Sequence, residues 1–173
     1  MDESPGSDAL DAIDAIVLDL RHVRPDLDSD GLQVTGRLLR LAQFVASRRE
    51  AILAPFGLSV ADFDMLASLR RRAGSGPVNV RDLLQWLMLS SGGMTKRLDR
   101  LEAVGLIERR RDPTDRRGVL IELTPAGLDV IENALTEVLA SERQLVTTAI
   151  DSAETLRHVE DGLRRLLLMD DQG

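Results

Sequence analysis

The chain has 173 residues, of which 43% are hydrophobic and 29% are charged, and its formal net charge is −7. This length and composition suit one or two compact units with a real core, and the absence of cysteine excludes disulfides, a thiol nucleophile and a thiolate metal site. The N-terminal sequence is acidic and periodic, and no apolar run reaches the ~18 residues of a membrane span, so we expect a soluble cytoplasmic protein.

Apolar residues recur at helical spacing over residues 8–23 and again from 32 to about 53. Aromatic residues make up only 2% of the chain, so the core must consist mainly of Leu, Ile, Val and Ala, a mixture that favours helices. Pro55 and Gly57 interrupt the second segment. The sequence therefore predicts two N-terminal helices followed by a break.

A third helix is expected after Ser59, which can cap it with Asp62 as capping partner, and it should extend to Arg72. Asn79 can cap a short helix over residues 80–89, because its side-chain oxygen can accept from free N–H groups of the first turn.

The next helix is predicted within "SSGGMTKRLDRLEAVG", where Met94, Leu98 and Leu101 form the buried stripe and Gly105 ends the helix. Two short helices joined by a tight Ser/Gly turn are the elements of a helix-turn-helix. In that motif the first turns of the second helix enter the major groove, so short polar and basic residues are expected there.

The stretch 108–127 contains five arginines. Within it, "LIERRR" and "GVLIEL" flank the turn "DPTDRR" and alternate as half-buried strands do. The sequence thus predicts a hairpin with arginines at its tip, directly after the second helix of the helix-turn-helix. Such a wing lies where its arginines can enter a narrow minor groove, whose negative potential attracts them.

The two aspartates of this turn have structural interpretations. Asp112 is expected to start the turn by bonding the backbone, and Asp115 to brace a neighbouring arginine. No histidine or further carboxylate accompanies them, so we expect neither a metal site nor a cofactor.

The charge is unevenly distributed along the chain. Residues 70–118 hold twelve Arg or Lys against six Asp or Glu, and the remainder holds ten against twenty-three. A basic middle between acidic ends is typical of a polyanion-binding site, although charge alone fits a solvated face equally well.

The C-terminal segment predicts two further helices. Thr124 can cap the first with Pro125 at its first position, and Asp151 with Glu154 resembles a capping box for the second. Both helices carry apolar stripes that are compatible with an ordinary core or with an intertwined dimer.

The segment 79–127 resembles the MarR family of bacterial transcriptional regulators. The likeness rests on "LSSGGMTKRLDRLEAVGLIERRRDPTDRRGVLIELTPAG", which contains Asp115-Arg116-Arg117 in the wing and Leu123-Thr124-Pro125-Ala126-Gly127 after it. The resemblance implies a mainly α fold with a small β-hairpin wing, in which a winged helix-turn-helix lobe joins a helical dimerisation region. It also implies a homodimer that binds a pseudo-palindromic DNA operator, is expected to be a repressor, and in this family is often released by a small aromatic or phenolic ligand.

The resemblance assigns DNA contacts to the recognition helix and the wing, with Arg117 at the wing tip: Ser91, Gly92, Thr95, Lys96, Arg97, Asp115, Arg116 and Arg117. It also points to a ligand pocket walled by Phe44, Arg48, Phe56 and Phe63, for which the alternative is that the three phenylalanines fill the hinge core.

The domain organisation expected from this likeness has three parts. Residues 1–53 and 124–173 form dimerisation helices, and residues 54–123 form the DNA-binding lobe. A winged-helix module that binds protein instead of an operator is the alternative function. The sequence lacks the motifs of a metalloprotease, a P-loop and a dinucleotide-binding enzyme, so no enzyme is expected.

Overall fold

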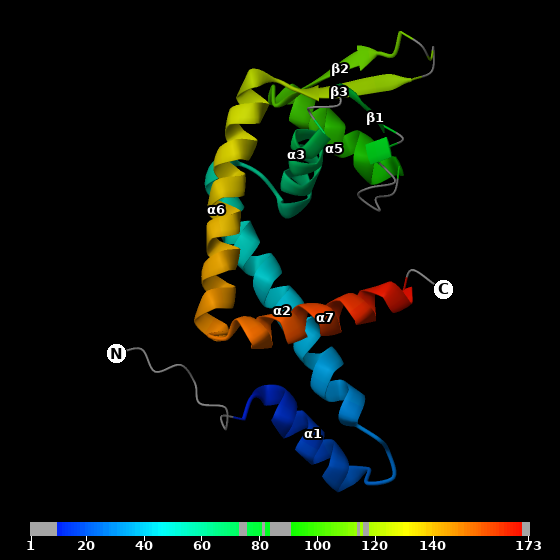
Figure 1. Cartoon of the computed structure of the whole chain (residues 1–173). Coiled ribbons are helices and arrows are strands. Elements are labelled where there is room, and N and C mark those ends of the chain that lie inside the picture. Colours follow the sequence, from blue (N-terminus) through cyan, green and yellow to red (C-terminus); the bar gives the residue numbers. More distant parts are fainter. Residues whose placement is uncertain are drawn as a thin grey trace. The chain divides into compact units, whose positions relative to one another are not determined.

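The computed structural model describes residues 10–72, 76–80, 82–83, 91–113, 115 and 118–170 (Figure 1). They divide into two compact units. One unit extends from Asp28 to Val138, and the other combines the described residues up to Leu27 with those from Leu139 onward. The assignment of the terminal segments to dimerisation stays a prediction.

Three successive helices open the larger unit, namely α2 (Asp30–Leu53), the 3-10 helix η1 (Ala54–Phe56) and α3 (Val60–Arg72). The break between α2 and α3 occurs where it was predicted. Pro55 lies in the first turn of η1, and Gly57 has a φ of 67°, a left-handed conformation that favours glycine. The chain can therefore turn sharply and begin α3.

Helix α5 (Ser91–Ala103) follows the predicted pattern. Met94, Leu98 and Leu101 are buried in the core, which confirms the expected apolar stripe. The helix is followed by Gly105, whose φ of 74° again requires the left-handed region. Most of the helix predicted over residues 80–89 lies outside the described residues.

Within the described residues the sheet has three antiparallel strands in the order β1–β3–β2 (Figure 1). The predicted hairpin is confirmed as β2 (Ile107–Arg111) and β3 (Val119–Leu123), with Arg109 opposite Ile121. Strand β1 (Val78–Asn79) was not predicted, because two residues are too few to show an alternating pattern.

The core of this unit gathers around α3. Its fully buried side chains come from α2, α3, α5, the strands, α6 and Leu83, so that α5 and the hairpin rest on one continuous apolar base. The largest of these side chains are Leu53, Met65, Leu66, Leu83, Met94, Leu101, Ile107, Ile121, Ile131 and Val138.

Helix α6 (Pro125–Ala149) begins in the larger unit and continues past its boundary at Val138. Its start is the one predicted: the hydroxyl of Thr124 accepts a hydrogen bond from the backbone N–H of Gly127 at 3.0 Å. Pro125 occupies the first helical position, where its missing N–H leaves no partner unsatisfied.

The smaller unit contains α1 (Ala12–Val23), the end of α6 and α7 (Ala153–Asp170). The predicted capping residue of α7 was wrong. The hydroxyl of Ser152, rather than the carboxylate of Asp151, accepts from the backbone N–H of Glu154 at 3.2 Å. Both residue types are good N-caps, and sequence spacing alone does not separate adjacent candidates.

In the described part of the chain, no single helix has the length and apolar character needed to cross a membrane, and α2 with α3 meets that test only as a pair bent by 75°. Within the same residues, His, Asp and Glu side chains do not gather in groups of three that could hold a metal ion.

Candidate nucleic-acid interface

Helix α5 presents a polar face to solvent. Successive residues of an α-helix are rotated by about 100°, so Lys96 lies opposite the buried side chains of Leu98 and Met94. Lys96 and Thr95 are both exposed. The backbones of Ser91 and Gly92 belong to the first turn of the same helix. The residues predicted to read DNA are therefore brought together on one helix.

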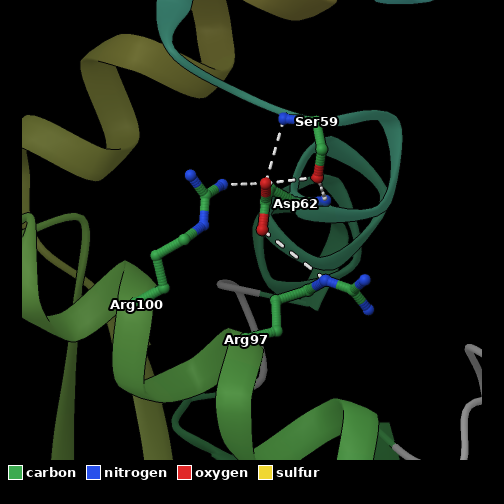
Figure 2. Close-up of polar contacts among 4 residues, drawn as sticks. All are labelled: Ser59, Asp62, Arg97 and Arg100. Atoms are coloured by element: carbon green, nitrogen blue, oxygen red, sulfur yellow. Dashed lines mark hydrogen bonds and ion pairs between the residues drawn. The ribbon is translucent and has the colours of Figure 1, made fainter.

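A buried carboxylate ties α5 to the start of α3 (Figure 2). Asp62 is only 1% exposed. Its Oδ2 accepts hydrogen bonds from the backbone N–H of Ser59 at 2.9 Å, from the hydroxyl of Ser59 and from the guanidinium of Arg100. Its Oδ1 faces the Nε of Arg97 at 3.5 Å. Burying a carboxylate is tolerable only with such partners.

These contacts change the interpretation of Arg97. The sequence assigns it to DNA, but its side chain is 23% exposed and is ion-paired with Asp62. Its Nη1 is buried and has no hydrogen-bond partner among the described residues. Arg97 is therefore held beside α3, whereas Lys96 projects to solvent. A direct contact of Arg97 with DNA stays a prediction, and its observed contacts favour a positioning role.

A second pair of ionic contacts joins α5 to the wing. Arg109 of β2 binds the carboxylate of Asp99 and approaches that of Glu102, with its Nε 3.2 Å from Oε2. Both acids belong to α5, so the wing arginine neutralises negative charge on the helix that is predicted to approach a polyanion.

The five arginines of the stretch 108–127 thus have different roles. Arg110 binds Glu108 and, at 2.7 Å, Glu122. The hydrogen bond and charge of Glu108, together with the charge of Glu122, raise the pKa of the Arg110 guanidinium. Arg110 is therefore paired within the hairpin and Arg109 is paired with α5, while Arg111 is exposed at the end of β2. The wing-tip residues Arg116 and Arg117 lie outside the described residues.

The base of the wing turn is closed by hydrogen bonds. Asp112 donates from its backbone N–H to the carbonyl of Gly118 at 3.1 Å, and its Oδ1 accepts from the backbone N–H of Asp115 at 3.2 Å. This confirms that Asp112 starts the turn. A Cβ at Gly118 would lie 2.8 Å from the Cβ of Asp112, so the close approach requires glycine. The expected bracing of an arginine by Asp115 stays a prediction.

The four residues proposed for a ligand pocket have different environments. Phe63 is buried in the core and Phe56 is a partly buried side chain packed against that core, as the hinge-core alternative expects. Phe44 is 49% exposed on α2, and Arg48 is half-buried on the same helix. Ligand binding by these residues stays a prediction.

Sequence reasoning missed the ion pairs that attach the recognition helix to its neighbours. They are made by Asp62, Arg100 and Arg109. Asp62 was recognised only as a capping partner for α3. The spacing of Arg97 and Arg100 places them on one side of α5, which was the available signal, but their partner lies far away in the sequence.

The chain is similar to known proteins over most of its length. The MarR family profile matches residues 56–118. The transcriptional regulator PecS of Dickeya dadantii is 33% identical over 140 residues, covering 81% of this chain and 84% of that protein. A mutant MarR of Escherichia coli, solved in complex with operator DNA, is 27% identical with a TM-score of 0.67, covering 86% of this chain and 97% of that one.

AbsC of Streptomyces coelicolor, a MarR family regulator, shares the fold with a TM-score of 0.74 at 24% identity, covering 85% of this chain and 99% of that one. The expected fold class, mainly α with a small winged sheet, is therefore confirmed. With PecS one-third identical over most of both chains, and with the MarR profile matched over residues 56–118, this chain belongs to the MarR family of DNA-binding transcriptional regulators.

Proposed function

We propose that this protein is a homodimeric repressor that binds a pseudo-palindromic operator, with α5 in the major groove and the wing beside the minor groove. The observation that carries the proposal is the division of charge around α5. Asp62 binds Arg100, and Arg109 binds Asp99, so ion pairs attach α5 to α3 and to the wing. Lys96 and Arg111 remain exposed. A helix fixed in this way keeps little freedom to lose when it binds.

The distribution of charged residues along the sequence supports the same proposal. The acidic flanks carry the negative charge of the protein, whereas the stretch 70–118 is basic. A polyanion is attracted to the basic stretch and repelled by the acidic segments, so the charge pattern favours DNA binding by α5 and the wing, since α5 and β2 lie in the basic stretch.

The dimer is supported by the smaller unit, which has little core of its own. Ile13 and Val17 are its buried hydrophobic side chains among the described residues. Many larger apolar side chains are exposed, and a second copy of the chain would remove them from water. They are Leu10, Ile16, Leu18, Val23, Leu27, Leu139, Val146, Val159, Leu163, Leu166, Leu167, Leu168 and Met169.

A repressor is the simplest role for such a dimer, because an operator occupied by protein is closed to other proteins. Release by a small aromatic or phenolic effector belongs to this proposal through the family resemblance. On α2, Phe44 is the exposed aromatic side chain that such a molecule could contact.

The proposal is tested by selection from a randomised double-stranded DNA library with the full-length protein. We expect recovery of an inverted repeat whose half-sites are centred about 10 bp apart, one helical turn or about 34 Å. Binding should weaken steeply as salt rises, because phosphate contacts release counterions. Recovery of random sequences with a shallow salt dependence would favour the alternative of a winged-helix module that binds protein.

A substitution at the wing tip tests the minor-groove contact. Arg117→Ala should weaken binding to the selected operator by about 1–3 kcal/mol, because it removes a cation from a groove of high negative potential. The affinity is measured by fluorescence anisotropy at constant salt. Arg24→Ala is the matched control, since Arg24 is an exposed arginine paired with Asp26 in the other unit. Equal effects of the two substitutions would remove the wing from the interface.

A further inference from the structure

The end of the recognition helix and the start of α6 are joined by a compact set of contacts. The hydroxyl of Thr124 donates to the carbonyl of Gly105 at 2.6 Å, and its backbone N–H donates to the carbonyl of Leu106 at 3.1 Å. The same hydroxyl accepts from the backbone N–H of Gly127 at 3.0 Å. One threonine therefore caps α6 and also holds the turn that follows α5.

Gly127 brings the two backbones into direct contact. It is the third residue of α6, and glycine has a lower helix propensity than almost any other residue, so local helix propensity does not account for it. A Cβ at this position would overlap the carbonyl oxygen of Leu106 and lie 2.8 Å from its carbonyl carbon. Only a hydrogen fits between the first turn of α6 and the turn after α5.

The turn itself is hydrogen-bonded to the end of α5. The backbone N–H of Leu106 donates to the carbonyl of Leu101 at 2.9 Å, and that of Gly105 donates to Glu102 at 2.9 Å. The side chain of Leu101 is fully buried. The contacts of Thr124 and Gly127 are thus made to a turn that is itself hydrogen-bonded to the last residues of the recognition helix.

We propose that Thr124 and Gly127 are positioning residues, which fix the angle between α5 and α6 and thereby set the separation of the two recognition helices in the dimer. This inference rests on the proposed function for its biological meaning, but the joint can be tested without DNA. We name the set Gly105, Leu106, Thr124 and Gly127 the α5–α6 joint.

Because α6 is long, a small change of angle at the joint displaces the far end of the helix by a large distance. Helix α6 has 25 residues and is therefore about 37 Å long at 1.5 Å per residue. A tilt of about 10° at one end moves the other by about 6 Å, nearly two base-pair steps of about 3.4 Å. An operator with fixed half-site spacing therefore requires a joint that scarcely bends.

The direct test measures the joint within one chain. The protein has no cysteine, so Lys96→Cys on α5 and Glu137→Cys on α6 give two unique exposed sites for spin labels. The labelled protein is diluted with unlabelled full-length protein, and the interspin distances are measured by double electron–electron resonance. We expect a narrow distribution, which Thr124→Val should broaden and Thr124→Ser should leave narrow because serine keeps the hydroxyl.

Ser152→Ala is the matched control. It removes a hydroxyl that caps α7, so it causes a comparable loss of helix capping away from the joint. Melting temperatures should fall for both Thr124→Val and Ser152→Ala, but only the first should broaden the distances. Gly127→Ala should shift or broaden them further. Gly127→Ala places a methyl group against the carbonyl of Leu106, and this clash disturbs the backbone in addition to the joint. The test of the proposal therefore relies on Thr124→Val.

The functional test uses the inverted-repeat duplex recovered by the wild-type protein, with its half-sites moved by 1 or 2 bp. The wild type should lose at least about tenfold in affinity on a 2 bp change, and Thr124→Val should lose less than about threefold. An unchanged distance distribution in Thr124→Val would overturn the inference. Failure of the wild type to select a repeat, with the distances behaving as expected, would overturn the proposed function alone.

Discussion

Replacement of Asp62 by alanine should lower the free energy of unfolding by about 2–4 kcal/mol and weaken DNA binding by the folded protein. Removing one partner of a buried ion pair leaves the other uncompensated, and here two arginines lose their partner. Arg97 and Arg100 are 23% and 48% exposed, so water reduces the loss. Urea unfolding followed by circular dichroism measures the change.

Asp64→Ala is the control for that experiment, because Asp64 lies on the same helix and is only half-buried. Its effect should stay within about 1 kcal/mol. If Asp62→Ala is no more destabilising than Asp64→Ala, the ion pairs of Asp62 do not hold α5 in place.

The same variant decides how Arg97 acts. If Arg97 works through Asp62, then Arg97→Gln should weaken DNA binding in the wild type but have little further effect in the Asp62→Ala background. Additive effects would instead show that Arg97 contacts DNA directly, as the sequence resemblance implied.

A second large effect is expected at the far end of the recognition helix. Leu101→Ala should lower the free energy of unfolding by about 2–5 kcal/mol, because it leaves a cavity where a fully buried side chain packs. Urea unfolding should show a lower midpoint with an unchanged slope.

Val104→Ala provides the comparison, since Val104 lies one turn away and is 60% exposed. Its effect should be within about 0.5 kcal/mol. A loss at Leu101 below about 1 kcal/mol would mean that the surrounding core closes around the cavity, and that α5 is held mainly by its ionic contacts.

Local signals in the sequence predicted much of this fold. The spacing of Met94, Leu98 and Leu101 identified the buried side of α5, and the Thr124-Pro125 pair identified the start of α6. Each signal is complete within a few residues, because helix periodicity and capping depend on near neighbours in the chain.

The attachment of the recognition helix could not be predicted in the same way. The contact of Asp62 with Arg100 joins residues 38 positions apart, and nothing in either neighbourhood specifies the partner. From the sequence, Arg109 could not be distinguished from the arginines predicted to contact DNA, whereas in the fold it pairs with Asp99. Charge composition identifies a basic region, but only tertiary structure separates the cations that are bound from those that are exposed.

The strand order has a further consequence for solubility. Among the described residues the order β1–β3–β2 makes β2 an edge strand, and an edge offers unpaired backbone groups to any passing strand. Four consecutive charged residues, from Glu108 to Arg111, occupy this edge. A second strand docking there would have to desolvate their charges, so the wing resists edge-to-edge aggregation while the protein is away from DNA.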